Sequence, residues 1–335
     1  MSELPLVSVC TPTFNRRPFI GALVQCFLAQ DYPPEKLEWH ILDDGSDPIG
    51  ALLPAKANVH YHYLPKKMSL GAKRNWLHQK AKGAIIVYMD DDDYYPPTRV
   101  SHAVYMLQTH PKVLCAGSSR MHIYFQDQQQ VYQVGPYGTN HATAATLAFW
   151  RKILAAPLNC AYDPTAALAE EKKFLKNFTL PMVQLDPMKT LLVFSHAHST
   201  CDKRRLLEDM NPDYVRTSPL QVHDFIADVG LRKFYLHDLE QALNNYAAGA
   251  VELKPDVVKA LQAQAQAQAQ AQVQEQVQVQ GQVSIVRGGQ QVEMSTAELV
   301  QLLDRQEADL TRLKELLHGK DAEIALLTEL CQGAL

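Results

Sequence analysis

Four consecutive aspartates, Asp90 to Asp93, are the side chains in this sequence best suited to hold a metal ion. They follow the apolar run 84–89, which has the character of a strand buried on both faces. In an extended chain Asp90 and Asp92 point to the same side, and two neighbouring carboxylates repel each other unless a cation joins them. Oxygen ligands of this kind suit Mg²⁺ or Mn²⁺. A solvated acidic loop is the alternative interpretation.

Two more polar groups follow strand-like stretches of the chain. Asp43 to Asp47 have the sequence DDGSD, which either contacts a ligand or simply forms a turn. Ser195 to Thr200 include His196 and His198, whose neutral rings are adequate ligands for manganese and poorer ones for magnesium. A structural role is the alternative for either histidine. Arg74 carries a guanidinium that suits planar anionic groups, with a surface ion pair as its alternative.

The elements that would position these residues alternate between strands and helices. The apolar patterns predict strands at 6–10, 37–42, 59–64 and 84–89, and helices at 19–30 and 71–82. Repeated strand–helix–strand units predict a parallel sheet, whose ligands lie beyond the carboxyl ends of its strands. The polar groups that follow the first, second and fourth strands are therefore expected to converge. Beyond residue 150 the pattern is mainly helical, at 165–177 and 220–248, with a short extended stretch at 191–195.

These motifs, in this order, resemble family 2 of the GT-A glycosyltransferases. The likeness begins at Val7 to Arg16 and continues through Asp43 to Asp47, which resembles the family's DDGSxD turn. Leu70 to Asn75 resembles its G-x-ARN segment, and Val87 to Asp93 resembles its DxD strand end. The resemblance covers roughly residues 5 to 205. It implies a GT-A nucleotide-diphospho-sugar transferase fold, which is an α/β fold with a Rossmann-like, mostly parallel sheet flanked by helices.

The resemblance also implies roles for individual residues. A nucleotide-sugar donor is expected, and a uridine nucleotide is favoured because a carboxylate such as Asp44 can accept the imide N–H of uracil. The residues expected to bind the donor are Thr11, Pro12, Asp43, Asp44, Arg74, Asp90 and Asp91. The residues expected to bind a divalent cation, Mn²⁺ or Mg²⁺, are Asp92, Asp90 and His196, and this cation would neutralise the leaving diphosphate.

The catalytic base is expected at Glu171, with Glu170 as the second choice. In this family the base is usually the aspartate of a Glu-Asp pair that opens a helix, and here glutamate stands in its place. Ordinary pairing with lysines three or four residues along an exposed helix is the alternative. The resemblance implies a single displacement with inversion at the anomeric carbon, and a retaining outcome stays open.

Two other classes of function compete with an enzyme that transfers sugar to an unidentified glycan, lipid or protein. One is a GT-A-like scaffold or binding protein that has lost turnover. Because Asp90, Asp92 and a carboxylate at position 171 are all present, the enzyme is favoured. The other is a nucleotidyltransferase, which would need a glycine-rich, basic first loop, whereas residues 11–17 contain no glycine.

Composition narrows the partners and the compartment. With 32 basic and 36 acidic residues the formal charge is −4, and no long block of lysine and arginine could follow a phosphate backbone, so nucleic acid is not expected as a partner. The six cysteines are far apart and form no CxxC pair, which fits reduced thiols in the cytoplasm. The apolar runs are too short to span a bilayer, so no transmembrane segment is expected.

Three segments are predicted: a catalytic domain at 1–255, a low-complexity Ala/Gln-rich linker at 256–292, and a C-terminal helix at 293–335. The helix would open with the capping box at 295–298 and repeats apolar residues every seven positions. The seam positions are Leu299, Leu303, Leu310, Leu313, Leu317, Ile324, Leu327 and Cys331. A coiled coil that forms a homo-oligomer through residues 295–331 is favoured over an amphipathic helix that folds back on the catalytic domain.

Overall fold

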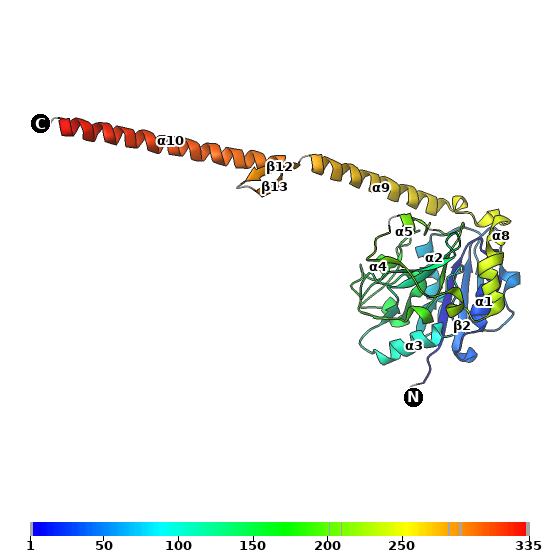
Figure 1. The fold of residues 1–335 in the computed structure, drawn as a ribbon. Coiled ribbons are helices and arrows are strands. Elements are labelled where there is room, and N and C mark those ends of the chain that lie inside the picture. Colours follow the sequence, from blue (N-terminus) through cyan, green and yellow to red (C-terminus); the bar gives the residue numbers. More distant parts are fainter. Residues whose placement is uncertain (1–2, 201, 209, 281, 288–289, 333–335) are drawn as a thin grey trace. The chain divides into compact units, whose positions relative to one another are not determined.

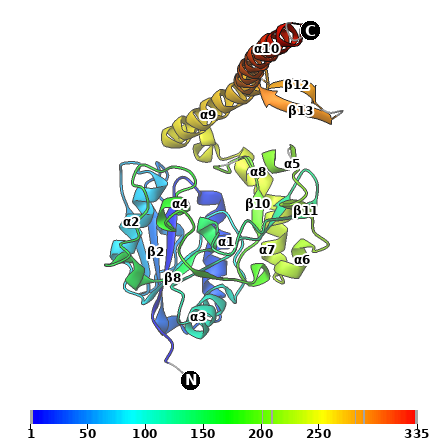
Figure 2. The same ribbon diagram turned by 90° about the vertical axis from the view of Figure 1, so that its left-hand side faces the viewer.

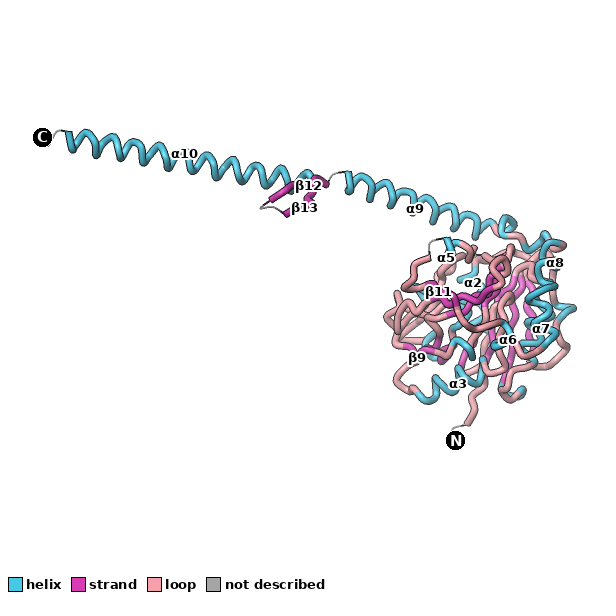
Figure 3. The backbone as a smooth tube through the Cα atoms, in the orientation of Figure 1, coloured by secondary structure: helices cyan, strands magenta, loops and turns pink. Residues whose placement is uncertain are grey.

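The computed structural model describes residues 3–200, 202–208, 210–280, 282–287 and 290–332. The chain divides into two compact units, Met1–Ala260 and Leu261–Leu335. The first unit contains two sheets surrounded by helices (Figures 1 and 3). Within the described residues, no helix combines the length and the apolar character needed to cross a lipid bilayer.

The larger sheet has seven strands in the order β3-β2-β1-β4-β8-β5-β9. Its strands are β1 (Val7–Thr13), β2 (Leu37–Asp43), β3 (Val59–Tyr63), β4 (Ile85–Tyr88), β5 (Cys115–Gly117), β8 (Ala148–Trp150) and β9 (Met182–Gln184). The first four strands run parallel to their neighbours, and β8 is antiparallel to both β4 and β5. The predicted mostly parallel α/β sheet is thus confirmed. The carboxyl ends of β1, β2 and β4 meet at one edge, as expected for parallel strands.

Helices cover this sheet on both faces, and every residue of the central strands β1, β2 and β4 is accordingly buried. Figure 2 shows α1 (Arg17–Leu28) and α2 (Leu70–Lys80) on opposite sides of β2. Val9 and Trp39 pack with the apolar face of α1, whereas Leu42 packs with Leu77 of α2. α3 (Arg99–Thr109) contributes Val100, Ala103, Val104 and Leu107 to the first of these cores.

A smaller sheet has the strand order β10-β6-β7-β11. Its strands are β6 (Met121–Phe125), β7 (Gln130–Val134), β10 (Val193–Ser195) and β11 (Val215–Thr217). Besides several short 3-10 helices, the first unit also contains α4 (Glu171–Phe174), α5 (Arg205–Glu208), α6 (Val222–Phe225), α7 (Val229–Lys233), the π-helical turn η6 (Phe234–Asp238) and α8 (Leu239–Asn244). Helix α8 lies beside α1 (Figure 1), so this late segment closes over the first helix of the chain.

Two local predictions are wrong. The long helix expected at 165–177 is reduced to the single turn α4, because Ala169 before it and Lys176 after it adopt positive φ angles of 49° and 53° that interrupt a right-handed helix. Strand β4 ends at Tyr88, and residues 91–93 form a turn and a bend, so the argument that Asp90 and Asp92 share one side of an extended chain does not apply.

The second unit contains a two-stranded antiparallel sheet of β12 (Gln282–Arg287) and β13 (Gln290–Ser295), followed by α10 (Thr296–Gln332). The long helix α9 (Pro255–Gln280), which starts in the first unit, covers most of the Ala/Gln tract, in line with the helix propensity of both residue types. The capping box is present: Ser295 Oγ accepts from Glu298 N, and Glu298 Oε2 accepts from Ser295 N. The linker and the coiled coil stay predictions.

Candidate donor and metal site

A solvent-open cleft of about 600 Å³ lies where the predicted polar groups converge. Most of its charged side chains come from the loop after β1, the start of α2 and the turn after β4, and Lys67, Lys254 and Asp256 add the others. The lining residues are Pro12, Thr13, Phe14, Arg16, Lys67, Met68, Leu70, Lys73, Arg74, Asp90, Asp91, Asp92, Ala167, Thr200, Lys254, Asp256 and Val257. Pro12, Arg74 and the first three aspartates of the acidic cluster are therefore brought together, as the sequence predicts.

Arg74 holds two carboxylates in fixed positions. Its Nη1 and Nη2 donate to Asp90 Oδ1 and Oδ2 at 3.1 and 3.0 Å, and its Nε donates to Glu170 Oε1 at 2.8 Å. The guanidinium lies 4.3 Å from the ring centroid of Tyr88, and the side chain is 1% exposed. Because three guanidinium nitrogens already donate to carboxylates, Arg74 orients Asp90 more directly than it presents a free charge to phosphates.

The backbone brings Arg74 to this position through a close approach at Gly71. The Gly71 amide donates to the carbonyl of Ala166 at 3.0 Å, and a Cβ at Gly71 would overlap the carbonyl oxygen of Asp163. Glycine is therefore required where α2 begins, because any side chain would push the 163–166 segment away. This segment leads directly into Glu170, so the contact at Gly71 also positions that carboxylate.

Asp92 and His196 form the pair best suited to hold a cation. His196 follows β10, and its Nε2 lies 3.3 Å from Asp92 Oδ2. Burial lowers the pKa of His196 to about 4 despite the neighbouring carboxylate, so the ring is neutral at pH 7, the form that binds metals. Among the described residues, its buried Nδ1 has no hydrogen-bond partner. A carboxylate oxygen and a neutral imidazole nitrogen fit Mn²⁺.

Arg16 balances the charge of the acidic turn. Its guanidinium lies 3.4 Å from both Asp91 Oδ1 and Asp92 Oδ2, and Nη1 also donates to the carbonyl of His198 at 2.8 Å. Burial raises the pKa of Asp91 and of Asp93. Burial acts in the same direction on Asp92, but the His196 hydrogen bond and the charge of Arg16 outweigh it and lower the pKa of that carboxyl. The turn thus holds at least one firmly ionised carboxylate.

Two lysines add positive charge to the cleft. Lys73 on α2 is buried, forms an ion pair with Asp44, and donates to the carbonyl of Thr13 at 2.8 Å. Burial lowers the pKa of Lys73, and it lowers that of Lys254 to about 7. Both ammonium groups are therefore poorly solvated, and an anionic ligand would stabilise their charged form.

The remaining residues predicted to bind the donor lie behind the cleft and do not line it. Thr11 is fully buried, and its hydroxyl donates to the carbonyl of Met89 at 2.6 Å and accepts from Trp39 Nε1 at 2.9 Å. Asp43 accepts from the amides of Gly45 and Ile49, which is the turn-forming role left open by the sequence. Asp44 accepts from the amide of Met68 and so fixes a residue that does line the cleft.

Glu171 opens α4 next to the buried Glu170 but is outside the set of residues that line the cleft. Burial and the charge of Glu170 raise its pKa to about 7. A carboxyl with this pKa is partly ionised at neutral pH and can both accept and release a proton, as a general base requires. Glu170, by contrast, already forms an ion pair with Arg74.

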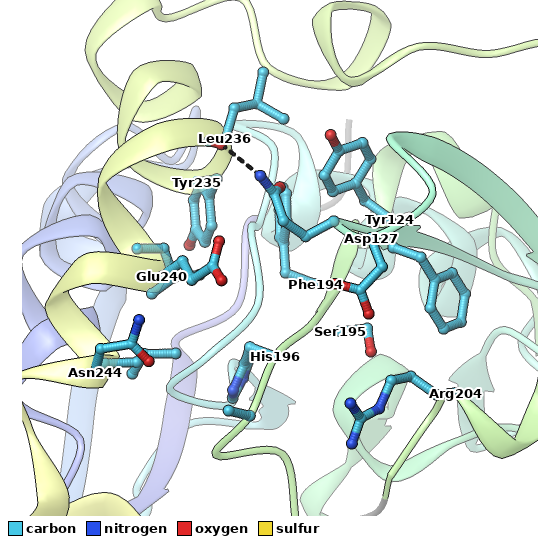
Figure 4. Close-up of a pocket in the computed structure, with 15 residues that line it drawn as sticks. Tyr124, Asp127, Phe194, Ser195, His196, Arg204, Tyr235, Leu236, Glu240 and Asn244 are labelled. Atoms are coloured by element: carbon cyan, nitrogen blue, oxygen red, sulfur yellow. Dashed lines mark hydrogen bonds between the residues drawn. The ribbon is translucent and has the colours of Figure 1, made fainter.

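A second pocket of about 820 Å³ lies on the other side of the His196 segment. Its walls combine aromatic residues, among them Tyr124, Phe194 and Tyr235, with aliphatic and polar ones. Figure 4 shows His196 facing Glu240 and Asn244 of α8 across this pocket. Since His196 also contacts Asp92, the histidine connects this pocket to the donor cleft.

Sequence reasoning assigned no role to three cations that surround the acidic turn: Arg16, Lys73 and Lys254. The first two lie inside the quoted motifs, so their position next to the aspartates could have been inferred once the strand ends converge. Lys254 comes from a segment more than 150 residues further along the chain. Nothing in its local sequence signals that it reaches the cleft.

A mostly parallel sheet with an acidic turn at the carboxyl end of its fourth strand is the architecture of a GT-A nucleotide-diphospho-sugar transferase domain. Residues 8–152 match the family model described as Glycosyl transferase family 2.

Two curated relatives are a glycosyltransferase of Haemophilus influenzae that is otherwise uncharacterised and TuaG of Bacillus subtilis, named for teichuronic acid biosynthesis. The first is 26% identical over 114 residues, covering 32% of this chain and 45% of the relative. The second is 32% identical over 94 residues, covering 27% of this chain and 36% of the relative. The chain therefore spans less than half the length of each of these relatives.

Two solved structures are similar at a greater distance. S. aureus TarS in complex with UDP-GlcNAc is 17% identical with a TM-score of 0.45, covering 56% of this chain and 58% of that one. The mannosyltransferase PcManGT from Pyrobaculum calidifontis, in complex with GDP-Man and Mn²⁺, is 18% identical with a TM-score of 0.47, covering 80% and 81%. Neither likeness is close enough to indicate a donor or an acceptor for this chain.

Proposed function

We propose that the protein transfers a sugar from a nucleotide-sugar donor, with a uridine nucleotide as the preferred donor, to an acceptor hydroxyl. One observation carries the proposal: the carboxylates of the acidic turn and five cationic side chains line a single open cleft at the carboxyl ends of the strands. A nucleoside diphosphate is an anion that such cations bind, and a carboxylate cluster can hold its counter-ion.

We further propose that Asp92 and His196 hold a divalent cation, Mn²⁺ or Mg²⁺. His196 Nε2 lies 3.3 Å from Asp92 Oδ2, and with the ring proton on Nδ1 the Nε2 of the neutral ring would offer its lone pair to the ion. When bound, the ion would offset the negative charge that develops on the leaving diphosphate. Asp90 is already paired with Arg74, so its role in this proposal is to contact the donor and not the ion.

Lys73, Lys254 and Arg16 supply the charge that would receive the phosphates. All three line the cleft, and burial has already removed much of the water around both ammonium groups. Because the carboxylate of Asp44 is turned toward Lys73, selection of uracil by that side chain would require Lys73 to shift toward the phosphates. The uridine preference rests on the family resemblance of the DDGSD turn.

Glu171 is our candidate for the base in an inverting displacement. The acceptor oxygen would form a bond to the anomeric carbon while the bond from that carbon to the diphosphate oxygen breaks. The hydroxyl proton passes to the Glu171 carboxylate, whose raised pKa suits this exchange. The catalytic domain would comprise residues 1–255, and the acceptor would be a glycan, lipid or protein. We propose the cytoplasm as the compartment, supported by the buried free thiols of Cys10, Cys26, Cys115 and Cys160.

The test is nucleotide release from a panel of UDP- and GDP-sugars with the full chain and Mn²⁺, repeated with a chelator. We expect release from at least one UDP-sugar and its loss with the chelator. Asp92→Asn should abolish release, whereas Asp202→Asn, at an exposed carboxylate outside the cleft, should not. If every activated sugar is ignored under all conditions, the chain is a nucleotide-sugar-binding or scaffold protein and the enzymatic proposal is wrong.

A further inference from the structure

A cluster of one glutamate and three histidines lies on strands β2 and β3. Glu38 and His40 are two residues apart on β2, so their side chains share one face of the sheet, and His60 and His62 do the same on β3. The parallel register pairs His40 with His60 and Leu42 with His62. One ligand atom each from Glu38, His40 and His60 lies within 4.8 Å of the other two.

The Glu38 carboxylate is buried and held in a fixed orientation. Its Oε1 accepts from Ser8 Oγ at 2.6 Å and from the amides of Lys82 and Gly83 at 2.7 and 3.2 Å. Its Oε2 faces His60 Nε2 at 4.0 Å. A carboxylate whose orientation is set by neighbouring donors is the arrangement found around protein metal ligands. Oε2 thus remains directed at His60.

His40 supplies an unused donor atom in the centre of this cluster. Its side chain is 5% exposed, and its Nε2 lies 3.2 Å from Glu38 Oε1. That contact lacks the direction of a hydrogen bond, so within the part of the chain that the structure describes this buried nitrogen has no hydrogen-bond partner. The other ring nitrogen, Nδ1, lies 3.4 Å from His62 Nε2. If Nδ1 carries the proton and donates to His62, the lone pair of Nε2 points at Glu38 and His60.

We propose that Glu38, His40 and His60 form a zinc site, separate from the donor cleft. Tetrahedral zinc with bonds of about 2.0–2.1 Å separates its ligand atoms by about 3.3 Å. At present His40 Nε2 lies 3.2 Å from Glu38 Oε1 and His60 Nε2 lies 4.0 Å from Glu38 Oε2, so the side chains must move for one carboxylate oxygen to share an ion with both histidines. Two imidazole nitrogens and one carboxylate favour zinc over the oxygen-preferring magnesium and calcium. The side chain of His60 is 35% exposed, which leaves a fourth position to water.

The position of the cluster separates it from the sugar-transfer site. Glu38 precedes Asp43, at the carboxyl end of β2, by five residues, which corresponds to about 17 Å along the strand. β3 is an edge strand of the large sheet, held on one side only by β2. An ion shared by the two strands would fix β3 at this edge, so the zinc would stabilise the fold and take no part in the transfer reaction.

The experiment uses the full chain purified without a histidine tag and stripped of metal by a chelator. Zinc affinity is measured by competition with an indicator, and Co²⁺ is added as a spectroscopic probe of the ligand geometry. We expect one tightly bound zinc, an intense visible band of tetrahedral cobalt, and a higher Tm with zinc. His60→Ala should weaken zinc binding by more than about 100-fold. His60→Cys, which restores a ligand, should recover the cobalt band.

Two controls separate this site from others. His223→Ala removes an exposed histidine far along the chain and should leave the zinc affinity unchanged. Asp92→Asn alters the proposed donor site and should likewise leave the tetrahedral cobalt band intact. The zinc site is disproved if the unaltered chain binds zinc no more tightly than His60→Ala, or if Asp92→Asn and not His60→Ala removes the cobalt band.

Discussion

Replacing Glu171 with glutamine tests the proposed base. Burial and the charge of Glu170 raise the pKa of Glu171 to about 7 from an ordinary value of 4.5. A base must be ionised to accept a proton, so turnover should rise with pH through about 7. With this pKa about 3% of Glu171 is ionised at pH 5.5, whereas an unperturbed glutamate would be about 90% ionised there. The raised pKa thus predicts a loss of about 30-fold in kcat/KM between the plateau and pH 5.5.

The same shift predicts an effect on stability. Because the pKa of Glu171 is higher in the folded than in the unfolded chain, its contribution to stability is full below about pH 4.5 and is lost as the pH rises through about 7. Above pH 7 the loss is at most about 3 kcal/mol, since one pKa unit corresponds to 1.36 kcal/mol. Glutamine cannot ionise, so Glu171→Gln should be more stable than the unaltered chain above pH 7 and equal to it near pH 4.

The assay is nucleotide release from the donor across pH 5 to 9 with saturating Mn²⁺, together with calorimetric donor binding. Glu171→Gln should bind the donor normally, release nucleotide very slowly and show no rising limb. Lys254, whose pKa burial lowers to about 7, loses its charge as pH rises, so it can produce only a falling limb. Near-normal turnover in Glu171→Gln, or an unchanged rising limb, would refute the assignment of the base.

Three further predictions concern the ion, the buried guanidinium and the tail. Asp92→Asn should remove the enhancement of UDP binding by Mn²⁺ in calorimetry while weak, metal-independent binding remains; an unchanged enhancement would place the ion elsewhere. Arg74→Met should lower the free energy of unfolding by about 3–5 kcal/mol in urea, because it leaves two carboxylates unpaired, and adding Glu170→Gln should recover part of the loss. Equilibrium sedimentation should show an oligomer for the full chain and a monomer for a chain that ends at residue 292; a monomeric full chain would exclude the coiled coil.

The sequence predicts the elements of the first half of the chain well because their signals are local. The strand at 84–89 and the helix at 71–82 have strong apolar patterns, and both are present as β4 and α2 with ends shifted by one or two residues. The segment 165–177 fails because its composition favours helix while tertiary contacts at Asp163 and Ala166 hold the chain in another path. Helix propensity is a local property and contains no information about such tertiary contacts.

The sequence predicts which loops meet at the cleft, but not all of the side chains that line it or how their charges pair. The convergence of the aspartates, Arg74 and the loop after β1 follows from the parallel sheet, and the cleft contains them. The ion-pair partner of each charged side chain depends on differences of a few ångströms in side-chain position. Arg74 could have faced a phosphate, yet it is held by Asp90 and Glu170. Thr11 precedes a residue that lines the cleft, but the strand turns its side chain toward Trp39.

The charge balance of the cleft gives a reason for metal and nucleotide to bind together. Arg16 now offsets the charge of Asp91 and Asp92, so a divalent cation alone would compete with that guanidinium for the same carboxylates. A diphosphate alone would be attracted by the cations but repelled by the carboxylates of the acidic turn. If a cation and a diphosphate bound as a pair, the ion would take the place of Arg16 beside the carboxylates and Arg16 would be free to pair with the phosphates. Each ligand then raises the affinity for the other by the same factor, because binding free energies are reciprocal. The enhancement by Mn²⁺ should therefore shrink in Arg16→Met, even though this variant removes no ligand of the ion.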